Sequence, residues 1–339
     1  MPPALLSGEA LDQLAVVDPE IQERLKTIPQ SWQPKGNDPV DIIMQMRAGY
    51  DRLPITPPQP EVQESQSTYT TRDGASLRLC IYKPARPPVN PMVCYVHYHG
   101  GGSCIGSPEL SAPFSRRVAQ EHSCVVIAVQ YRLAPEHRFP TQVEDSWDAL
   151  QYIAAHASDF GAQLSAGFVI GGESAGAVIA AVLALQARDQ RLSPPLTGSF
   201  LSTGSYFNPD AIPKPYQASY RSRKDPACLN SPMLSASVKA AFDSCVQGDY
   251  SSPLFKAALW PSGHRDLPRT CLQTCGMDIN RDDGILYHHL LAQSGVTTKL
   301  DVYPGCPHCF WHLFPDVAQG KKWRRDTAEG LKWLFSAVD

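Results

Sequence analysis

The sequence predicts an α/β protein with a mostly parallel central sheet and helices on both of its faces. Short apolar runs of strand length alternate with longer segments of helical periodicity, and this alternation is typical of parallel sheets. The chain has 339 residues, of which 43% are hydrophobic, and this is enough to bury one large core. The expected strands are residues 67–71, 77–82, 92–98, 124–130, 167–171, 198–202, 270–275 and 298–303. The expected helices are residues 112–121, 142–156, 174–188, 236–245, 283–294 and 322–337.

Two segments fall outside this alternation. Residues 1–58 carry apolar side chains such as Leu11 and Ile42 at helical spacing and end in a proline-rich linker. Residues 206–247 separate two expected strands and are rich in Pro, Ser, Tyr and basic residues. Insertions of this size usually act as lids or binding elements. We therefore expect residues 1–58 and the insertion at about 206–247 to form a helical cap on a main domain of residues 59–339.

Composition excludes several classes of protein. The formal net charge of −3 argues against a nucleic acid partner. No apolar stretch approaches the ~20 residues that cross a membrane, and the N-terminus lacks the pattern of a secretory signal. We expect a cytoplasmic protein.

The ten cysteines are expected to be buried free thiols, because they are scattered and several lie in apolar strands. Cys306 and Cys309 form a C-x-x-C, and Cys271 and Cys275 a C-x-x-x-C, which raises the idea of a zinc site. The second pair falls inside an expected core strand, so the usual four-ligand zinc pattern is not met. We predict no metal site.

Ser174 lies in the pentapeptide Gly172-Glu173-Ser174-Ala175-Gly176, between an expected strand and an expected helix. This is the pattern of a nucleophile elbow. The tight turn strains the serine backbone, and side chains at the two glycine positions would collide with the neighbouring strand and helix. The pattern predicts an exposed, reactive hydroxyl above the sheet, with the start of a helix behind it.

A glycine run follows the expected strand 92–98, in His99-Gly100-Gly101-Gly102. Consecutive glycines expose backbone N–H groups that can bind an oxyanion, and this run accompanies the serine elbow in many lipases and esterases. We expect Gly101 and Gly102 to be oxyanion donors, together with the N–H of Ala175. A phosphate loop is disfavoured, because no Lys-Ser/Thr pair follows the glycines.

An acyl-transfer serine also needs a base and an acid that orients it, both at strand ends after the serine. Asp278 follows the expected strand 270–275, and His308 follows the strand 298–303. Asp282 and Asp283 compete for the acid role, but we expect them to open a helix and cap its free N–H groups. His312 competes for the base role.

These motifs together resemble the hormone-sensitive-lipase-type carboxylesterases of the α/β-hydrolase superfamily. The resemblance covers about residues 67–339. It rests on the glycine run and the serine elbow, and on these further matching segments: residues 131–140, Glu144-Asp145, Ser252-Pro253-Leu254, Asp278 with Arg281-Asp282, and His308. It implies the α/β-hydrolase fold with a helical cap, favours Asp278 over Asp282 and His308 over His312, and gives residues 131–140 a structural role near the floor of the site.

The chain departs from the family pattern at three points near the site. Ser103-Cys104 replaces the aromatic residue that usually follows the glycines, and Glu173 stands where Asp or Thr is more common. Cys309 stands where the family usually has glycine. These changes bear on substrate choice, and we expect Glu173 to be a structural carboxylate behind the elbow.

The resulting hypothesis is a serine esterase that acts on a small-molecule ester through an acyl-enzyme, without metal or organic cofactor. The insertion carries four aromatic residues: Tyr206, Phe207, Tyr216 and Tyr220. If they close a small pocket, we expect a substrate with a short acyl group. They are equally compatible with the core of a lid. One alternative is a biosynthetic tailoring enzyme that uses the same triad on a lactone, a thioester or an acyl acceptor other than water. A non-catalytic binder is disfavoured by the complete triad. Homodimers occur in the family.

Overall fold

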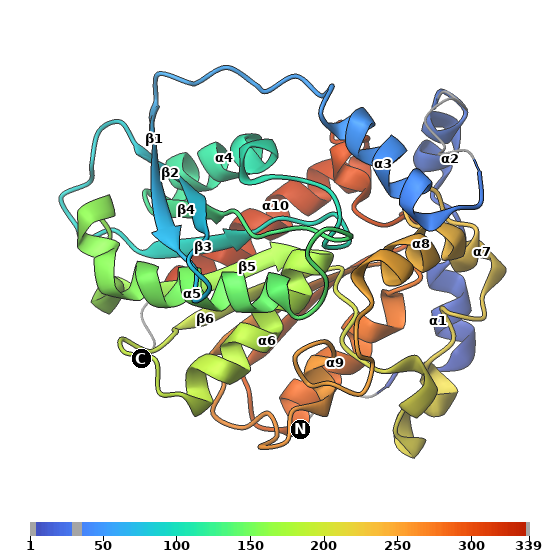
Figure 1. Cartoon of the computed structure of the whole chain (residues 1–339). Coiled ribbons are helices and arrows are strands. Elements are labelled where there is room, and N and C mark those ends of the chain that lie inside the picture. Colours follow the sequence, from blue (N-terminus) through green and yellow to red (C-terminus); the bar gives the residue numbers. More distant parts are fainter. Residues whose placement is uncertain (1–4, 29–35, 337–339) are drawn as a thin grey trace.

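The computed structural model describes residues 5–28 and 36–336, and these fold around an eight-stranded sheet (Figure 1). The strand order is β1-β2-β4-β3-β5-β6-β7-β8. The first two strands form an antiparallel hairpin at one edge, and β3 to β8 run parallel. The predicted α/β-hydrolase fold class is confirmed. The strands are β1 Val62–Thr70, β2 Ser76–Pro84, β3 Cys94–Tyr98, β4 Val125–Val129, β5 Phe168–Glu173, β6 Gly198–Ser202, β7 Arg269–Cys275 and β8 Thr298–Tyr303.

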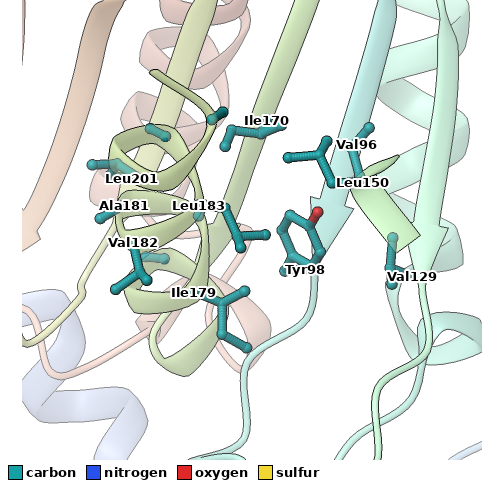
Figure 2. Close-up of a cluster of buried hydrophobic side chains, with 14 of the residues drawn as sticks. Val96, Tyr98, Val129, Leu150, Ile170, Ile179, Ala181, Val182, Leu183 and Leu201 are labelled. Atoms are coloured by element: carbon teal, nitrogen blue, oxygen red, sulfur yellow. The ribbon is translucent and has the colours of Figure 1, made fainter. Parts of the chain in front are cut away.

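The alternation of side chains along the strands divides the core into two layers. On β3, Val96 and Tyr98 point into one layer and Tyr95 into the other. The first layer is covered by α5 (Thr141–His156), α6 (Ala175–Asp189) and α9 (Arg281–Gln293), and the second by α4 (Ala112–His122) and α10 (Ala318–Phe335). Figure 2 shows Ile179 and Leu183 of α6 against Val96, Tyr98 and Ile170 of the sheet. Helix α6 is apolar on nearly all sides, which suits a helix buried beside the central strands.

The N-terminal helices lie beside the inserted helices at one end of the sheet (Figure 1). Helices α1 (Gly8–Leu14), α2 (Pro19–Leu25) and α3 (Pro39–Tyr50) come from the N-terminal segment, and α7 (Pro226–Leu229) and α8 (Ala236–Val246) from the insertion. Side chains of α3 and α8 share one core cluster, which includes Ile43, Phe242 and Val246. The predicted helical cap is therefore present. Residues 1–4 and 29–35 of the predicted segment 1–58, and the end of the last expected helix, lie outside the described residues.

The aromatic residues of the insertion pack as core. Tyr206 stacks on Tyr287 of α9, with ring centroids 4.3 Å apart, and Phe207 meets Tyr216 edge to face. Tyr206, Phe207, Tyr216 and Tyr220 are all buried in the same layer as α9. These four residues therefore join the core between the sheet and α9 and not a separate lid core, and they lend no support to a small aromatic pocket.

The ten cysteines are buried free thiols, as predicted. None of the helices within residues 5–28 and 36–336 combines the length and apolarity needed to span a bilayer.

Candidate active site

Ser174 occupies the sharp turn between β5 and α6. Its backbone has φ 53° and ψ −119°, a conformation that is costly for any residue other than glycine. The turn is held by the Ser174 N–H, which donates to the Ser202 carbonyl at 2.8 Å. A Cβ atom on Gly172 or Gly176 would press on the Tyr98 carbonyl, which explains the glycine on each side of the elbow. Strand β5 ends at Glu173, two residues after the predicted end at 171, and helix α6 begins at Ala175, one residue after the predicted start at 174.

The structure brings the three predicted side chains into one hydrogen-bonded series. His308 Nε2 lies 2.9 Å from Ser174 Oγ, and His308 Nδ1 lies 2.6 Å from Asp278 Oδ2. Asp278 is fully buried, and its other oxygen accepts the Asn280 N–H at 2.9 Å. The carboxylate is thus fixed in place, and it orients the imidazole toward the hydroxyl.

The surroundings of His308 make it a stronger base than a free histidine. Burial by itself lowers the pKa of His308, but the adjacent Asp278 carboxylate, together with Cys309, outweighs burial and raises the pKa well above its usual value. A more basic imidazole accepts a proton from Ser174 more readily.

The glycine run approaches Ser174 from the end of β3. Gly101 and Gly102 have φ of +110° and +59°, which favours glycine at both positions. Within the described part of the chain, the N–H groups of Gly101, Gly102 and Ala175 donate to no protein acceptor. Ala175 directly follows Ser174 at the start of α6, and a Cβ on Gly100 would lie 3.4 Å from the Ser174 Cβ, so free donors at this elbow suit a developing oxyanion.

The competing residues have other partners. Asp282 accepts the backbone N–H of Ser222 at 2.5 Å, and Asp283 accepts those of Tyr206 and Phe207 at 2.8 and 2.9 Å. Both carboxylates lie in the first turn of α9, as expected, but the prediction that they cap its N–H groups is wrong. They hold the insertion instead, because they accept backbone N–H groups of the insertion.

His312 does not face the serine. Its Nε2 lies 2.9 Å from both carboxylate oxygens of Glu173, and the Trp311 indole N–H donates to the same carboxylate at 3.3 Å. Burial alone raises the pKa of Glu173, but His312 outweighs it and the net pKa is lowered. Glu173 is a paired carboxylate behind the elbow, as predicted.

A family model described as the alpha/beta hydrolase fold matches residues 95–312. This range includes the glycine run, the elbow and the three side chains of the hydrogen-bonded series. The chain belongs to the α/β-hydrolase family. The resemblance to the hormone-sensitive-lipase-type carboxylesterases within that family is confirmed by the named relatives.

This α/β-hydrolase is similar to known proteins over nearly its whole length. It is 32% identical to the AB hydrolase superfamily protein B1A11.02 of Schizosaccharomyces pombe, over 96% of each chain. It is 29% identical to the versiconal hemiacetal acetate esterase of Dothistroma septosporum, over 88% of this chain and 89% of the other. Among solved structures, vibralactone cyclase superposes with a TM-score of 0.88 at 29% identity, over 99% of this chain and 98% of that one.

Sequence reasoning missed the residues that hold the glycine run of this α/β-hydrolase. The Tyr131 hydroxyl donates to the His99 carbonyl at 2.7 Å, and its ring stacks on the His99 ring at 4.3 Å. From the cap, Arg47 Nε donates to the Cys104 carbonyl at 2.6 Å. Residues 131–140 stood out as a motif, so Tyr131 was within reach of the sequence; no pattern singled out Arg47.

Proposed function

We propose that this α/β-hydrolase is a carboxylic ester hydrolase in which Ser174 is the nucleophile, His308 the base and Asp278 the residue that orients it. The observation that carries the proposal is the unbroken hydrogen-bond series from Asp278 through His308 to Ser174. The esterase name of a relative that spans most of the chain supports the reaction class.

The proposed mechanism has two halves. His308 takes the proton of the Ser174 hydroxyl as the oxygen attacks the ester carbonyl, and the N–H groups of Gly101, Gly102 and Ala175 bind the oxyanion. The protonated His308 then gives its proton to the departing alcohol, which leaves an acyl-Ser174 ester. Water attacks this ester with His308 again as base, the acid departs, and the serine is restored.

We propose that residues 1–58 and the insertion 206–247 act as the cap over this site, on a catalytic domain of residues 59–339. The shared core of α3 and α8 supports the division, and so does the position of Phe242. A Cβ on Gly102 would meet the Phe242 ring, so helix α8 rests directly on the proposed oxyanion loop. The cap therefore limits the space available to the substrate.

Replacement of Ser174 tests the proposal. Ser174→Ala is expected to lower kcat for p-nitrophenyl acetate by on the order of 10⁵-fold, because the nucleophile is lost. A fluorophosphonate probe is expected to label wild type at Ser174, as located by peptide mass mapping. His312→Gln is the control, and it is expected to keep its activity. Undiminished turnover by Ser174→Ala would show that Ser174 is not the nucleophile.

A second candidate function uses the same residues for acyl transfer within one substrate. The near-complete superposition on vibralactone cyclase supports it. In that reaction a nucleophile on the substrate, in place of water, attacks the acyl-Ser174 ester. Turnover of a panel of simple esters distinguishes acyl transfer from general ester hydrolysis. If no simple ester is hydrolysed while the fluorophosphonate probe still labels Ser174, the tailoring function is favoured.

The homodimer and the cytoplasmic location expected from the sequence stay predictions. Light scattering of the purified protein measures the mass in solution, and fluorescence microscopy of a tagged chain in its native cell gives the location.

A further inference from the structure

Three potential metal ligands from distant parts of the chain meet beside the catalytic residues. Glu173 ends β5, and Cys309 and His312 lie on the loop that carries His308. One ligand atom from each residue, a carboxylate oxygen, Sγ and an imidazole nitrogen, lies within 4.8 Å of the other two. None of the three side chains bonds to substrate or transfers a proton in the proposed mechanism, and Cys309 acts there only on the pKa of His308.

The donor set is one that zinc prefers. Zinc is bound in proteins by thiolate, imidazole and carboxylate, and three protein ligands leave one position of the tetrahedron open. Soft thiolate ligands also select zinc over magnesium or calcium. Two neighbouring groups hold the ligands in place: the Trp311 N–H reaches Glu173 at 3.3 Å, and Thr203 Oγ1 lies 3.3 Å from Cys309 Sγ. Such contacts orient ligands in known metal sites.

An ordinary ion pair accounts for only part of this arrangement. Glu173 and His312 already pair with each other, yet the buried Cys309 Sγ also lies within 4.8 Å of a ligand atom of each. Cys309 replaces the glycine that the resembled family usually carries at this position. The His312 side chain is 51% exposed, so a cation can reach the three donors from solvent.

We propose that Glu173, Cys309 and His312 form an inhibitory binding site for Zn²⁺. On binding, the Cys309 thiol releases its proton to solvent and the thiolate coordinates the ion. His312 Nε2 releases to solvent the proton that it donates to Glu173 and binds the metal through the freed lone pair, and the fourth position is left to water.

Occupancy of this site inhibits catalysis through geometry. Zinc draws its ligands to about 2.0–2.3 Å, so the three side chains must close in on the ion. Cys309 adjoins His308 and Glu173 adjoins Ser174, so this movement displaces both reacting groups. A misplacement of about 1 Å costs on the order of 100-fold in rate.

Cobalt titration tests the binding half without any activity measurement. Metal-free protein, kept reduced with a phosphine, is titrated with Co²⁺ and followed by absorption. Wild type is expected to bind one equivalent with visible bands of tetrahedral cobalt and a thiolate-to-cobalt charge-transfer band. Cys309→Ser is expected to lose the charge-transfer band, and His312→Gln to bind at least about tenfold more weakly. Cys306→Ser, which removes another buried thiol of the same loop, is the matched control and is expected to behave as wild type.

Zinc inhibition tests the second half, which rests on the proposed ester hydrolysis. Zn²⁺ is expected to inhibit wild type and Cys306→Ser, with recovery on EDTA, and to leave His312→Gln active at the same concentration. His312 is half-exposed, so this variant stays informative even if Cys309→Ser fails to fold.

Equal inhibition of wild type and His312→Gln would overturn the inhibitory site. A missing charge-transfer band in wild type would overturn the thiolate site, even in an active esterase. An inactive wild type that still shows the band would instead count against the proposed hydrolysis.

Discussion

At the scale of single residues, the site depends on backbone conformations that only a few residue types tolerate. Ser174 is held at positive φ by its fit between strand and helix, and the glycines around it are required by contact with Tyr98. These requirements are local, so a sequence pattern exposes them. The hydrogen bond from Tyr131 to His99 is equally close to the chemistry, but it joins residues from different strand ends. Two substitutions test the local backbone requirement and the long-range hydrogen bond one at a time.

Gly101→Ala is expected to lower kcat by about 10²–10³-fold. An added Cβ at this position would lie against the backbone of Ile105, and φ of +110° is unfavourable for alanine, so the proposed oxyanion N–H must move. Gly74→Ala is the matched control, because Gly74 has φ of +89° with open space around it. Steady-state kinetics and urea unfolding of both variants provide the comparison. Equal kcat values in the two variants would contradict the oxyanion role proposed for the Gly101 N–H.

Tyr131→Phe is expected to lower kcat roughly five- to tenfold, because the His99 carbonyl loses a hydrogen bond worth about 1 kcal/mol while the ring stack remains. Tyr69→Phe is the control: Tyr69 donates to the Gln130 carbonyl at 2.6 Å, and this hydrogen bond has no partner in the glycine run. Both variants should lose similar stability in urea, but only Tyr131→Phe should lose kcat. A normal kcat in Tyr131→Phe would mean that the glycine run needs no such anchor.

At the scale of elements, one side chain joins the cap to the active site. Arg47 of α3 donates to the Cys104 and Ala134 carbonyls and binds Glu136 with its two terminal guanidinium nitrogens. Cys104 lies two residues after the glycine run, and Ala134 and Glu136 lie in the motif 131–140. A short helix has little stability in isolation, so α3 depends on such contacts and on α8.

Arg47→Lys is expected to loosen α3, because a lysine cannot reproduce the forked hydrogen bonds. The expected results are a higher KM with a smaller change in kcat, and faster tryptic cleavage at Arg52 near the end of α3. Arg24→Lys, in an exposed ion pair with Asp316, is the control and should match wild type in both assays. Unchanged proteolysis of Arg47→Lys would show that α8 alone holds the helix.

At the scale of the whole molecule, a buried polar network joins the insertion to helix α9 and to the loop after β6. Lys256 is 2% exposed, donates to the Ser205 hydroxyl at 3.0 Å and lies over the Tyr250 ring at 4.7 Å. Burial is the main reason that its pKa falls from 10.5 to about 7. The cations Lys239 and Arg223 lower the pKa of Lys256 further. The carboxylates Asp283 and Asp243 raise it.

The lowered pKa of Lys256 predicts how stability depends on pH. Between about pH 7 and 10.5 the unfolded chain holds a proton on Lys256 that the folded chain lacks, so this group makes the folded state more stable as pH rises. The free energy of unfolding of wild type, relative to Lys256→Met, should therefore increase by about 2 kcal/mol from pH 7 to pH 9. Urea unfolding at both pH values measures this. A difference that stays constant would mean that Lys256 is charged throughout.

The order of strands and helices along the chain and the glycine-flanked serine could be predicted from the amino acids alone, because periodicity and backbone conformation are set by neighbouring residues. The same patterns left Asp278, Asp282 and Asp283 as candidates for the acid and His308 and His312 for the base, and the family resemblance favoured one of each. Three findings required the folded chain: which carboxylate and imidazole reach Ser174, that Asp282 and Asp283 hold the insertion, and that Arg47 meets the segment after the glycine run. Those contacts join strand ends and helices far apart in the chain. Their distances depend on how the sheet, the insertion and the N-terminal helices pack together, and no local pattern contains that information.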